Sequence, residues 1–187
     1  MGANALIAVG SNATSQHGDP AQTVEAALAA LDARGLRVVA RSRIFRTAFV
    51  PRGAGPDVLN AAAVLETRLG PEALLAELHG IEAEFGRVRR KRWGSRTLDL
   101  DLLLMGDAVL PDLAAFRAWQ EMHPDDQARQ APDGLILPHP RLAERAFVLV
   151  PAAEVAPDWR HPVLGRTIAG LLADLPEDDL KTVRPAG

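Results

Sequence analysis

The sequence predicts an α+β fold of the ferredoxin-like (βαββαβ) type, an antiparallel sheet with helices on one face and further helices at the C-terminal end. Periodic segments follow one another in the order strand, helix, strand, strand, helix, strand, which is the split βαβ pattern. Both helical segments begin at a proline and end at a glycine, which are typical helix boundaries. We expect these two helices to cover one face of the sheet and to leave the other face free for a site.

The first half of the pattern is a strand, a helix and a second strand. Residues 5–9 are a short apolar run, which predicts a buried strand. Asp19 and Pro20 then supply an N-cap and a first-turn proline for a helix that ends at Gly35. Residues 36–45 alternate between two faces, which predicts the second strand.

The second half follows a loop at residues 47–56, which holds prolines and glycines. Residues 58–67 alternate as a third strand. A second helix begins at Pro71 and ends at Gly86, with an apolar stripe at helical spacing. Residues 98–105 then form a fourth strand, whose leucines anchor it in a core.

The rest of the chain predicts helices around one insertion. We expect a surface insertion with a short helix at residues 112–134, a helix from Leu142, a last helix near residues 167–175 and a loose tail at residues 176–187. No internal repeat or low-complexity linker divides the sequence, so we expect residues 1–187 to form a single domain.

The composition excludes several classes of protein. The 187 residues are 48% hydrophobic and 24% charged with a net charge of −3, which does not favour a general nucleic-acid binder. The absence of cysteine excludes disulfides and thiolate chemistry. The N-terminus lacks the cationic start and long apolar run of a signal peptide, and no segment is long enough to span a membrane. We therefore expect a cytoplasmic location.

The most informative stretch joins a cationic segment, residues 87–96, to the fourth strand. Since side chains alternate along a strand, Asp99 and Asp101 should share a face with Leu103 and Met105. The other face should carry Leu98, Leu100, Leu102 and Leu104. Two carboxylates on a rigid strand suit Mg²⁺, which leaves its other positions to water and phosphate. Either feature alone is weak, because basic runs are commonly solvated loops, but together they indicate phosphoryl transfer.

Three further features have both a structural and a functional interpretation. The turn Gly10-Ser11-Asn12 is either a plain turn or a set of exposed backbone N–H groups. Asn60, among alanines and valines, is either satisfied by backbone or contacts a ligand. His79 and Glu82 lie three residues apart on the second helix and form either a solvated pair or a ligand contact.

Six short motifs occur in an order that resembles one family. They are Ala-Val-Gly-Ser-Asn at 8–12, Phe-Arg-Thr at 45–47, Leu-Asn-Ala-Ala at 59–62, Gly-Arg-Val-Arg at 86–89, Arg-Trp-Gly-Ser-Arg-Thr-Leu-Asp-Leu-Asp at 92–101 and Pro-His at 138–139. The block at 92–101 is the most specific of them. From about Ala3 to Pro157 the sequence resembles the 6-hydroxymethyl-7,8-dihydropterin pyrophosphokinase family.

The resemblance implies a reaction and its cofactors. Enzymes of this family transfer a pyrophosphoryl group from ATP to the hydroxymethyl oxygen of a reduced pterin, with attack at the β-phosphorus and release of AMP, in folate biosynthesis. By resemblance, Asp99 and Asp101 hold two Mg²⁺ ions, which agrees with their shared face on the strand.

The resemblance also implies roles for individual residues. Catalytic roles are implied for Arg87, Arg96, Asp99 and Asp101, with Arg90 assisting at the phosphates. A pterin pocket is implied at Thr47, Val50, Asn60, Trp93 and Phe147. Nucleotide contacts are implied at His79, Glu82, Arg89, Leu100, His139 and Arg145. In this family the arginine-rich loop closes over the substrates, Asn60 would hydrogen-bond the pterin edge and Phe147 would stack on its ring.

Three departures from the family pattern affect these roles. Many relatives have an aromatic residue where Val58 stands, so one stacking face worth about 1 kcal/mol is reduced and a lower pterin affinity is expected. Some relatives have tyrosine at the position of Pro140. The insertion at residues 112–134 displaces a region where some relatives place a further ATP-contacting arginine, and Arg117 or Arg129 could substitute for it.

Three other functions remain open. A ferredoxin-like sheet can bind single-stranded RNA, but that needs aromatic residues on the open face, and only Phe45 could serve. The protein could instead be a different Mg²⁺-dependent transferase. The absence of a P-loop motif counts against the common kinases of that class. A relative that binds pterin or ATP without turnover is disfavoured by the intact pair Asp99 and Asp101. We expect a monomer that takes small-molecule substrates, with neither nucleic acid nor membrane as partner.

Overall fold

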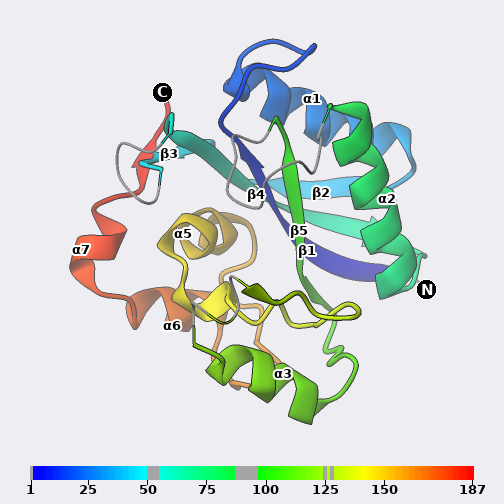
Figure 1. The fold of residues 1–187 in the computed structure, drawn as a ribbon, viewed down its shortest axis with the longest axis vertical. Helices are drawn as coiled ribbons and strands as arrows, with labels where there is room; N and C mark the ends of the chain where they lie inside the picture. The colour runs from blue at the N-terminus through cyan, green and yellow to red at the C-terminus, as the bar shows by residue number, and fades with distance from the viewer. Residues whose placement is uncertain (1, 50–54, 87–96, 124–125, 127–128) are drawn as a thin grey trace.

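An antiparallel sheet packed between helices forms the centre of the computed structural model, which describes residues 2–49, 55–86, 97–123, 126 and 129–187 (Figure 1). The strands are β1 (Ala3–Ser11), β2 (Arg37–Arg41), β3 (Phe45–Thr47), β4 (Val58–Thr67), β5 (Asp99–Met105) and β6 (Arg184–Pro185). The helices are α1 (Pro20–Ala33), α2 (Pro71–Glu84), α3 (Leu113–Glu121), the 3₁₀ turn η1 (Leu142–Glu144), α5 (Ala146–Val155), α6 (Ile168–Ala173) and α7 (Glu177–Leu180). The chain therefore has the mixed α+β architecture that the sequence predicts.

The sheet has the order β5–β1–β4–β3–β6, and β2 also pairs with β4. One side of β4 pairs with β1 from Ala3↔Thr67 to Ser11↔Leu59. The other side pairs with β2 and then with β3. The strand predicted at residues 36–45 is therefore two strands. Between them the Ser42 hydroxyl oxygen, in place of a backbone carbonyl, accepts from the Ala62 N–H at 2.9 Å.

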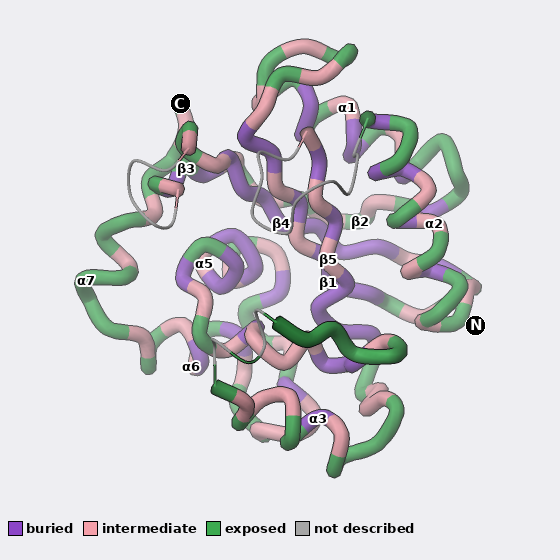
Figure 2. The backbone as a smooth tube through the Cα atoms, in the orientation of Figure 1, coloured by how far each residue is buried: buried purple, intermediate pink, exposed green. Residues whose placement is uncertain are grey.

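Two hydrophobic cores lie on opposite faces of the sheet, and Figure 2 shows the buried backbone concentrated in the strands and in α5. Helices α1 and α2 pack on one face, as predicted. The other face was predicted to be free, and this is wrong, because α5 covers part of it. Leu6, Val64 and Leu103 form an apolar area there that Val148 and Leu149 of α5 bury. An apolar area of this kind is stabilised by removal from water.

A bulge in β5 changes which core its side chains enter. Leu6 pairs with Leu104 and Ile7 pairs with Leu102, so Leu103 is an extra residue in the ladder. As a result Leu103 and Leu104 both pack in the core beside α5, and Met105 packs in the core beside α1 and α2. The prediction of strict alternation is therefore correct as far as Leu103 and wrong for Leu104 and Met105.

The predicted insertion leaves and returns to the same place in the fold. Leu110 and Leu137 exchange two backbone hydrogen bonds, N–H to O, at 2.7 and 3.1 Å. Between them α3 buries Phe116 completely, with the Phe116 ring centroid 5.6 Å from that of His161. The stretch is thus attached to the body of the protein by a buried aromatic ring as well as by its two ends.

The C-terminal tail differs from its prediction as a loose segment. Residues 177–180 form α7, and β6 pairs with β3 through Phe45↔Pro185 and Arg46↔Arg184. The Ala186 N–H also donates to the Ile44 carbonyl at 2.9 Å. The order comes from the backbone edge of β3, which a polar tail sequence does not reveal. In the part of the chain that is described, no helix has the length and apolar character needed to cross a membrane.

Candidate active site

The predicted metal and pterin residues lie side by side across three adjacent strands. Gly10 of β1 pairs with Asn60 of β4 on one side and with Asp99 of β5 on the other. Paired residues of neighbouring strands project from the same face of a sheet. A Cβ atom at Gly10 would lie 3.7 Å from Asn60 Oδ1 and 3.8 Å from Asp99 Cβ. Glycine therefore leaves a space between the amide and the carboxylate.

A second row of small residues lies one step along the same face. Ala8 pairs with Ala62 on β4 and with Asp101 on β5. Asp99 and Asp101 are both half-buried and project from the face that α5 covers further along the sheet. The two carboxylates therefore stand at the border between the α5 core and solvent.

Asn60 is held by β3 and by its own strand. Its Nδ2 donates to Thr47 Oγ1 at 2.9 Å and to the Val58 carbonyl at 3.3 Å. Asn60 and Thr47 are both buried, each 7% exposed. The amide nitrogen is thus satisfied within the protein, and Oδ1 lies on the side of Gly10. The structural interpretation of Asn60 from the sequence is therefore confirmed for Nδ2, and a ligand contact through Oδ1 stays a prediction.

His139 lies next to β5, because its N–H donates to the Leu103 carbonyl at 2.9 Å. Burial lowers the pKa of His139 to about 3, with the positive charge of Arg145 acting in the same direction and the carboxylate of Asp99 opposing it. The imidazole is therefore neutral at physiological pH. Its Nδ1 accepts from the Arg141 N–H at 3.1 Å, which leaves the proton on Nε2.

Arg145 stands immediately before α5 and acts on the same carboxylates. Burial lowers the pKa of Arg145, and the negative charges of Asp101 and Asp99 raise it. Its guanidinium carbon lies 5.7 Å from the centroid of the Phe147 ring. Phe147 is 37% exposed, although large apolar side chains are usually buried. A cation, an exposed ring and two carboxylates thus meet at the start of α5.

Glu82 has a structural contact that the sequence did not reveal. The side chain is 2% exposed, and Oε1 accepts from the Leu100 N–H at 2.8 Å. Because β5 ends the sheet, this N–H has no ladder partner on its outer side, and the carboxylate takes that place. Leu100 itself points into the core beside α1 and α2, while His79 is exposed on α2.

The turn after β1 fixes the start of β5. Ser11 Oγ donates to the Thr97 carbonyl at 2.7 Å, and both Ser11 and Asn12 are buried. Within the described ranges, Thr97 Oγ1 is the one buried side-chain oxygen or nitrogen without a hydrogen-bond partner. Ser11 and Thr97 were not among the predicted site residues. The sequence signal that could have found them is their place in two of the family motifs, since Ser11 lies in the motif at 8–12 and Thr97 in the motif at 92–101.

The donor set suits a hard divalent cation. The described residues contain no cluster of three or more His, Cys, Asp and Glu side chains that would enclose a metal ion. Asp99 and Asp101 supply carboxylate oxygens from one face of β5 and leave further coordination positions to other ligands. Mg²⁺ is commonly held in this way, whereas structural zinc takes four protein ligands. The residues therefore fit Mg²⁺.

Comparison with known proteins decides the family. A family model described as 7,8-dihydro-6-hydroxymethylpterin-pyrophosphokinase (HPPK) matches residues 6–157. The chain belongs to the HPPK family. This confirms both the family and the enzyme class predicted from the sequence, since several relatives bear the name 2-amino-4-hydroxy-6-hydroxymethyldihydropteridine pyrophosphokinase.

The HPPK relatives differ in how much of their length this chain covers. The protein from Methylorubrum extorquens is 38% identical over 183 residues, covering 96% of this chain and 98% of its own length. The Pseudomonas aeruginosa protein is 37% identical, covering 94% and 93%. The Synechocystis protein is 44% identical over 117 residues, which are 63% of this chain and 50% of that protein. The chain thus spans half of one relative and nearly all of two others.

Solved structures of HPPK relatives share the fold. A crystal structure of a Plasmodium falciparum HPPK-DHPS double variant with pterin and p-hydroxybenzoate superposes with a TM-score of 0.63 at 14% identity. The match covers 92% of this chain and 43% of that chain. At this level of identity the likeness concerns the fold, which is a mixed α+β fold with an antiparallel sheet.

Five of the predicted HPPK site residues lie outside the described residues. They are Val50, Arg87, Arg89, Trp93 and Arg96, and Arg90 lies there too. Their roles therefore stay predictions. The structure brings together the others that flank the sheet face, namely Thr47, Asn60, Asp99, Asp101, His139, Arg145 and Phe147.

Proposed function

We propose that this chain transfers the pyrophosphoryl group of ATP to the hydroxymethyl oxygen of 6-hydroxymethyl-7,8-dihydropterin, giving AMP and the pterin diphosphate in folate biosynthesis. Family membership and two relatives covered over nine tenths of their length support this reaction. The observation that carries the proposal is the row Asn60–Gly10–Asp99, which sets a hydrogen-bonding amide beside a candidate metal ligand.

The pterin would bind on the Asn60 side of that row. Since Asn60 Nδ2 is already bonded to Thr47 and Val58, the ligand would be recognised by Oδ1, an acceptor that suits the amino and ring N–H donors of a pterin. The exposed Phe147 ring would stack on the heterocycle. Val50 and Trp93 complete the proposed pocket.

The phosphates would bind on the Asp99 side. Two Mg²⁺ ions held by Asp99 and Asp101 would neutralise the phosphate charge and clamp the entering and leaving oxygens. Arg145, as a cation, and the neutral His139, through Nε2–H, would donate to phosphate oxygens. We propose that Arg87 and Arg96, with Arg89 and Arg90 assisting, stabilise the charge that develops during transfer.

The transfer itself needs little covalent chemistry from the protein. The hydroxymethyl oxygen forms a bond to the β-phosphorus while the bond from that phosphorus to the α-phosphate oxygen breaks, and the hydroxyl proton passes to solvent or phosphate. Catalysis of this kind rests on positioning and electrostatic stabilisation. The rigid pairing of β1 with both β4 and β5 supplies the positioning, since it fixes Asn60 relative to Asp99.

The remaining nucleotide contacts are proposed along the outer edge of β5. Leu100 would contact the nucleotide through its main chain, because its side chain lies in the core. Glu82 and His79 lie on α2, which packs beside β5, and would approach the ribose. The ferredoxin-like topology is also part of the proposal, supported by the order β5–β1–β4 followed by β2 and β3. We further propose a cytoplasmic monomer.

The test is the nucleotide product formed from MgATP and the reduced pterin. AMP that appears only with the pterin supports the proposal, ADP indicates a simple kinase, and binding without product indicates a relative without turnover. Asp99→Asn and Asp101→Asn should each lower AMP formation by about 10²-fold or more while far-UV circular dichroism stays unchanged. Asp107→Asn, in the exposed turn after β5, is the matched control and should keep full activity. Turnover that survives both site variants would refute the metal assignment.

A further inference from the structure

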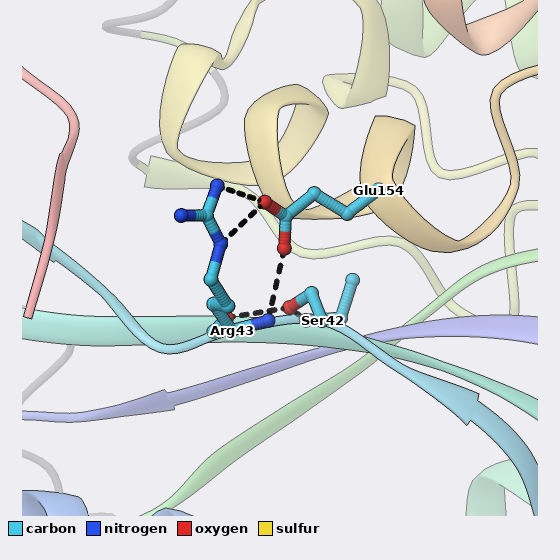
Figure 3. Close-up of polar contacts among 4 residues, drawn as sticks. Ser42, Arg43 and Glu154 are labelled. Atoms are coloured by element: carbon cyan, nitrogen blue, oxygen red, sulfur yellow. Dashed lines mark hydrogen bonds and ion pairs between the residues drawn. The ribbon is translucent and has the colours of Figure 1, made fainter.

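The C-terminal end of α5 is attached to the sheet by one arginine and one glutamate (Figure 3). Glu154 Oε1 accepts from Arg43 Nε at 2.8 Å and from Arg43 Nη2 at 2.5 Å. Glu154 Oε2 accepts from the Arg43 backbone N–H at 2.9 Å. Both oxygens are therefore bound by donors of a single residue, and this contact is called the Arg43–Glu154 pair below.

Arg43 lies at the junction between β2 and β3, where the backbone leaves the ladder. The neighbouring Ser42 hydroxyl donates to the Arg43 carbonyl at 2.7 Å (Figure 3). The same hydroxyl accepts from the Ala62 N–H. The guanidinium carbon of Arg43 lies 5.4 Å from the centroid of the Phe45 ring. Phe45 pairs with Asn60 in the sheet. Arg43 thus connects α5 to the strand that supports the Asn60 amide.

Helix α5 extends from the phosphate side of the site to this junction. At its start, Arg145 acts electrostatically on Asp101 and Asp99 of β5. Near its end, Glu154 contacts Arg43. Phe147 and Glu154 lie seven residues apart, which is about two helical turns and places them on the same side of the helix. Phe147 therefore lies on the same line along α5 as Glu154, so a rotation of the helix that moves one of them also moves the other.

Helix α5 also packs on the sheet through apolar side chains. Val148, Leu149 and Ala152 pack against Leu6 and Val64. Apolar contacts stabilise the helix but have no directional preference, so they restrict its rotation about its own axis less than hydrogen bonds do. A forked guanidinium and a backbone N–H on one carboxylate define a direction. The pair therefore gives α5 a directional contact with the junction between β2 and β3, which its apolar contacts do not supply.

We propose that the Arg43–Glu154 pair is a positioning element for the pterin pocket, which sets the Phe147 ring over the Thr47–Asn60 edge and thereby determines affinity for the pterin. This inference rests on the proposed function. Asp99 and Asp101 lie on β5 and not on α5, so a change in the rotation of α5 leaves both carboxylates in place and should affect the nucleotide and the chemical step little.

The test compares Arg43→Met, Glu154→Gln and the double variant in steady-state kinetics. We expect KM for the pterin to rise about threefold to tenfold in each, with KM for ATP and kcat within about twofold of the wild type. The double variant should have the same pterin KM as either single variant, because each single change already breaks the Arg43–Glu154 pair. Arg43→Lys, which keeps the charge but not the fork, should restore part of the affinity.

Arg41→Met is the matched control. Arg41 lies two residues earlier, at the end of β2, and pairs with Glu25 of α1, on the other side of the sheet from α5. This pair contacts α1 and not α5, so its loss should leave both KM values unchanged. A pterin KM that rises as much in Arg41→Met as in Arg43→Met would overturn the inference.

Two further outcomes also contradict it. One is a fall in melting temperature of Arg43→Met with no change in pterin KM, which would make the pair purely structural. The other is an equal rise in both KM values. Equilibrium titration with the reduced pterin and a non-hydrolysable ATP analogue measures the Kd for the pterin without any turnover, so it separates this inference from the proposed function. A wild type that binds the pterin without forming AMP would refute the proposed function, while the Kd of Arg43→Met would still decide this inference.

Discussion

Replacing His161 with asparagine tests how a buried imidazole makes the stability of this fold depend on pH. His161 is 1% exposed, and its Nδ1 accepts from the N–H groups of Val163 and Leu164, both at 3.2 Å. Burial lowers the pKa of His161 to about 4. In the unfolded chain the same group has a pKa of about 6.5.

The sign of the effect follows from these two values. Between about pH 4 and 6.5 the unfolded chain binds a proton at His161 and the folded chain does not, so the free energy of unfolding rises with pH across this range. The contribution is complete above about pH 6.5 and is lost as pH falls toward 4. At about 1.4 kcal/mol per pH unit, it amounts to about 3 kcal/mol.

Urea unfolding of the wild type and of His161→Asn between pH 4 and 7 measures this contribution. An asparagine oxygen can accept from the same backbone N–H groups but does not titrate. Other titrating groups, such as His139, remain in both proteins and cancel in the difference. We expect the wild type to lose about 3 kcal/mol more than the variant from pH 7 to pH 4. Parallel curves for the two proteins would refute the reasoning.

Two other predictions concern the strands of the site. Glu82→Ala leaves the Leu100 N–H without its acceptor and should lower the free energy of unfolding by about 1–3 kcal/mol. Glu82→Gln keeps an acceptor oxygen and should lower that free energy less. Urea unfolding of both variants measures the difference. Gly10→Ala places a methyl at ordinary contact distance from Asn60 and Asp99 and should fold and react, whereas Gly10→Val fills the space between them and should slow AMP formation about tenfold with little change in melting temperature. Full activity of Gly10→Val would show that this space is not used.

Features with local signals could be predicted from the sequence. Helix α2 begins at Pro71, as its first-turn proline indicates, and β4 has the bounds that its alternation gave. The shared face of Asp99 and Asp101 follows from the two-residue period of a strand. Their place beside Asn60 needed the strand order as well, and the split βαβ pattern implied that order.

Features that depend on distant partners could not be predicted. The bulge at Leu103 depends on how β1 pairs with β5, and the strand β6 depends on the edge of β3. Glu82 resembled an exposed helical residue, because helical spacing cannot show that a strand edge nearby lacks an acceptor. The covering of the second face required knowing where α5 returns to the sheet.

The bulge at Leu103 has a consequence for how the chain tolerates insertions and deletions. A one-residue length change in a regular strand reverses the facing of every residue beyond it. In β5 the bulge at Leu103 already makes this change of facing. It lies after Asp99 and Asp101 in the strand, whereas the contact of Ser11 with Thr97 lies before them. A deletion or insertion at or after Leu103 would change only which core the leucines beyond it enter. The pairing of Ala8 with Asp101 and of Gly10 with Asp99 would still keep both carboxylates on the face of the site. Loss of one residue between Thr97 and Asp101 has no such site of adjustment and would turn a carboxylate into the core beside α1 and α2.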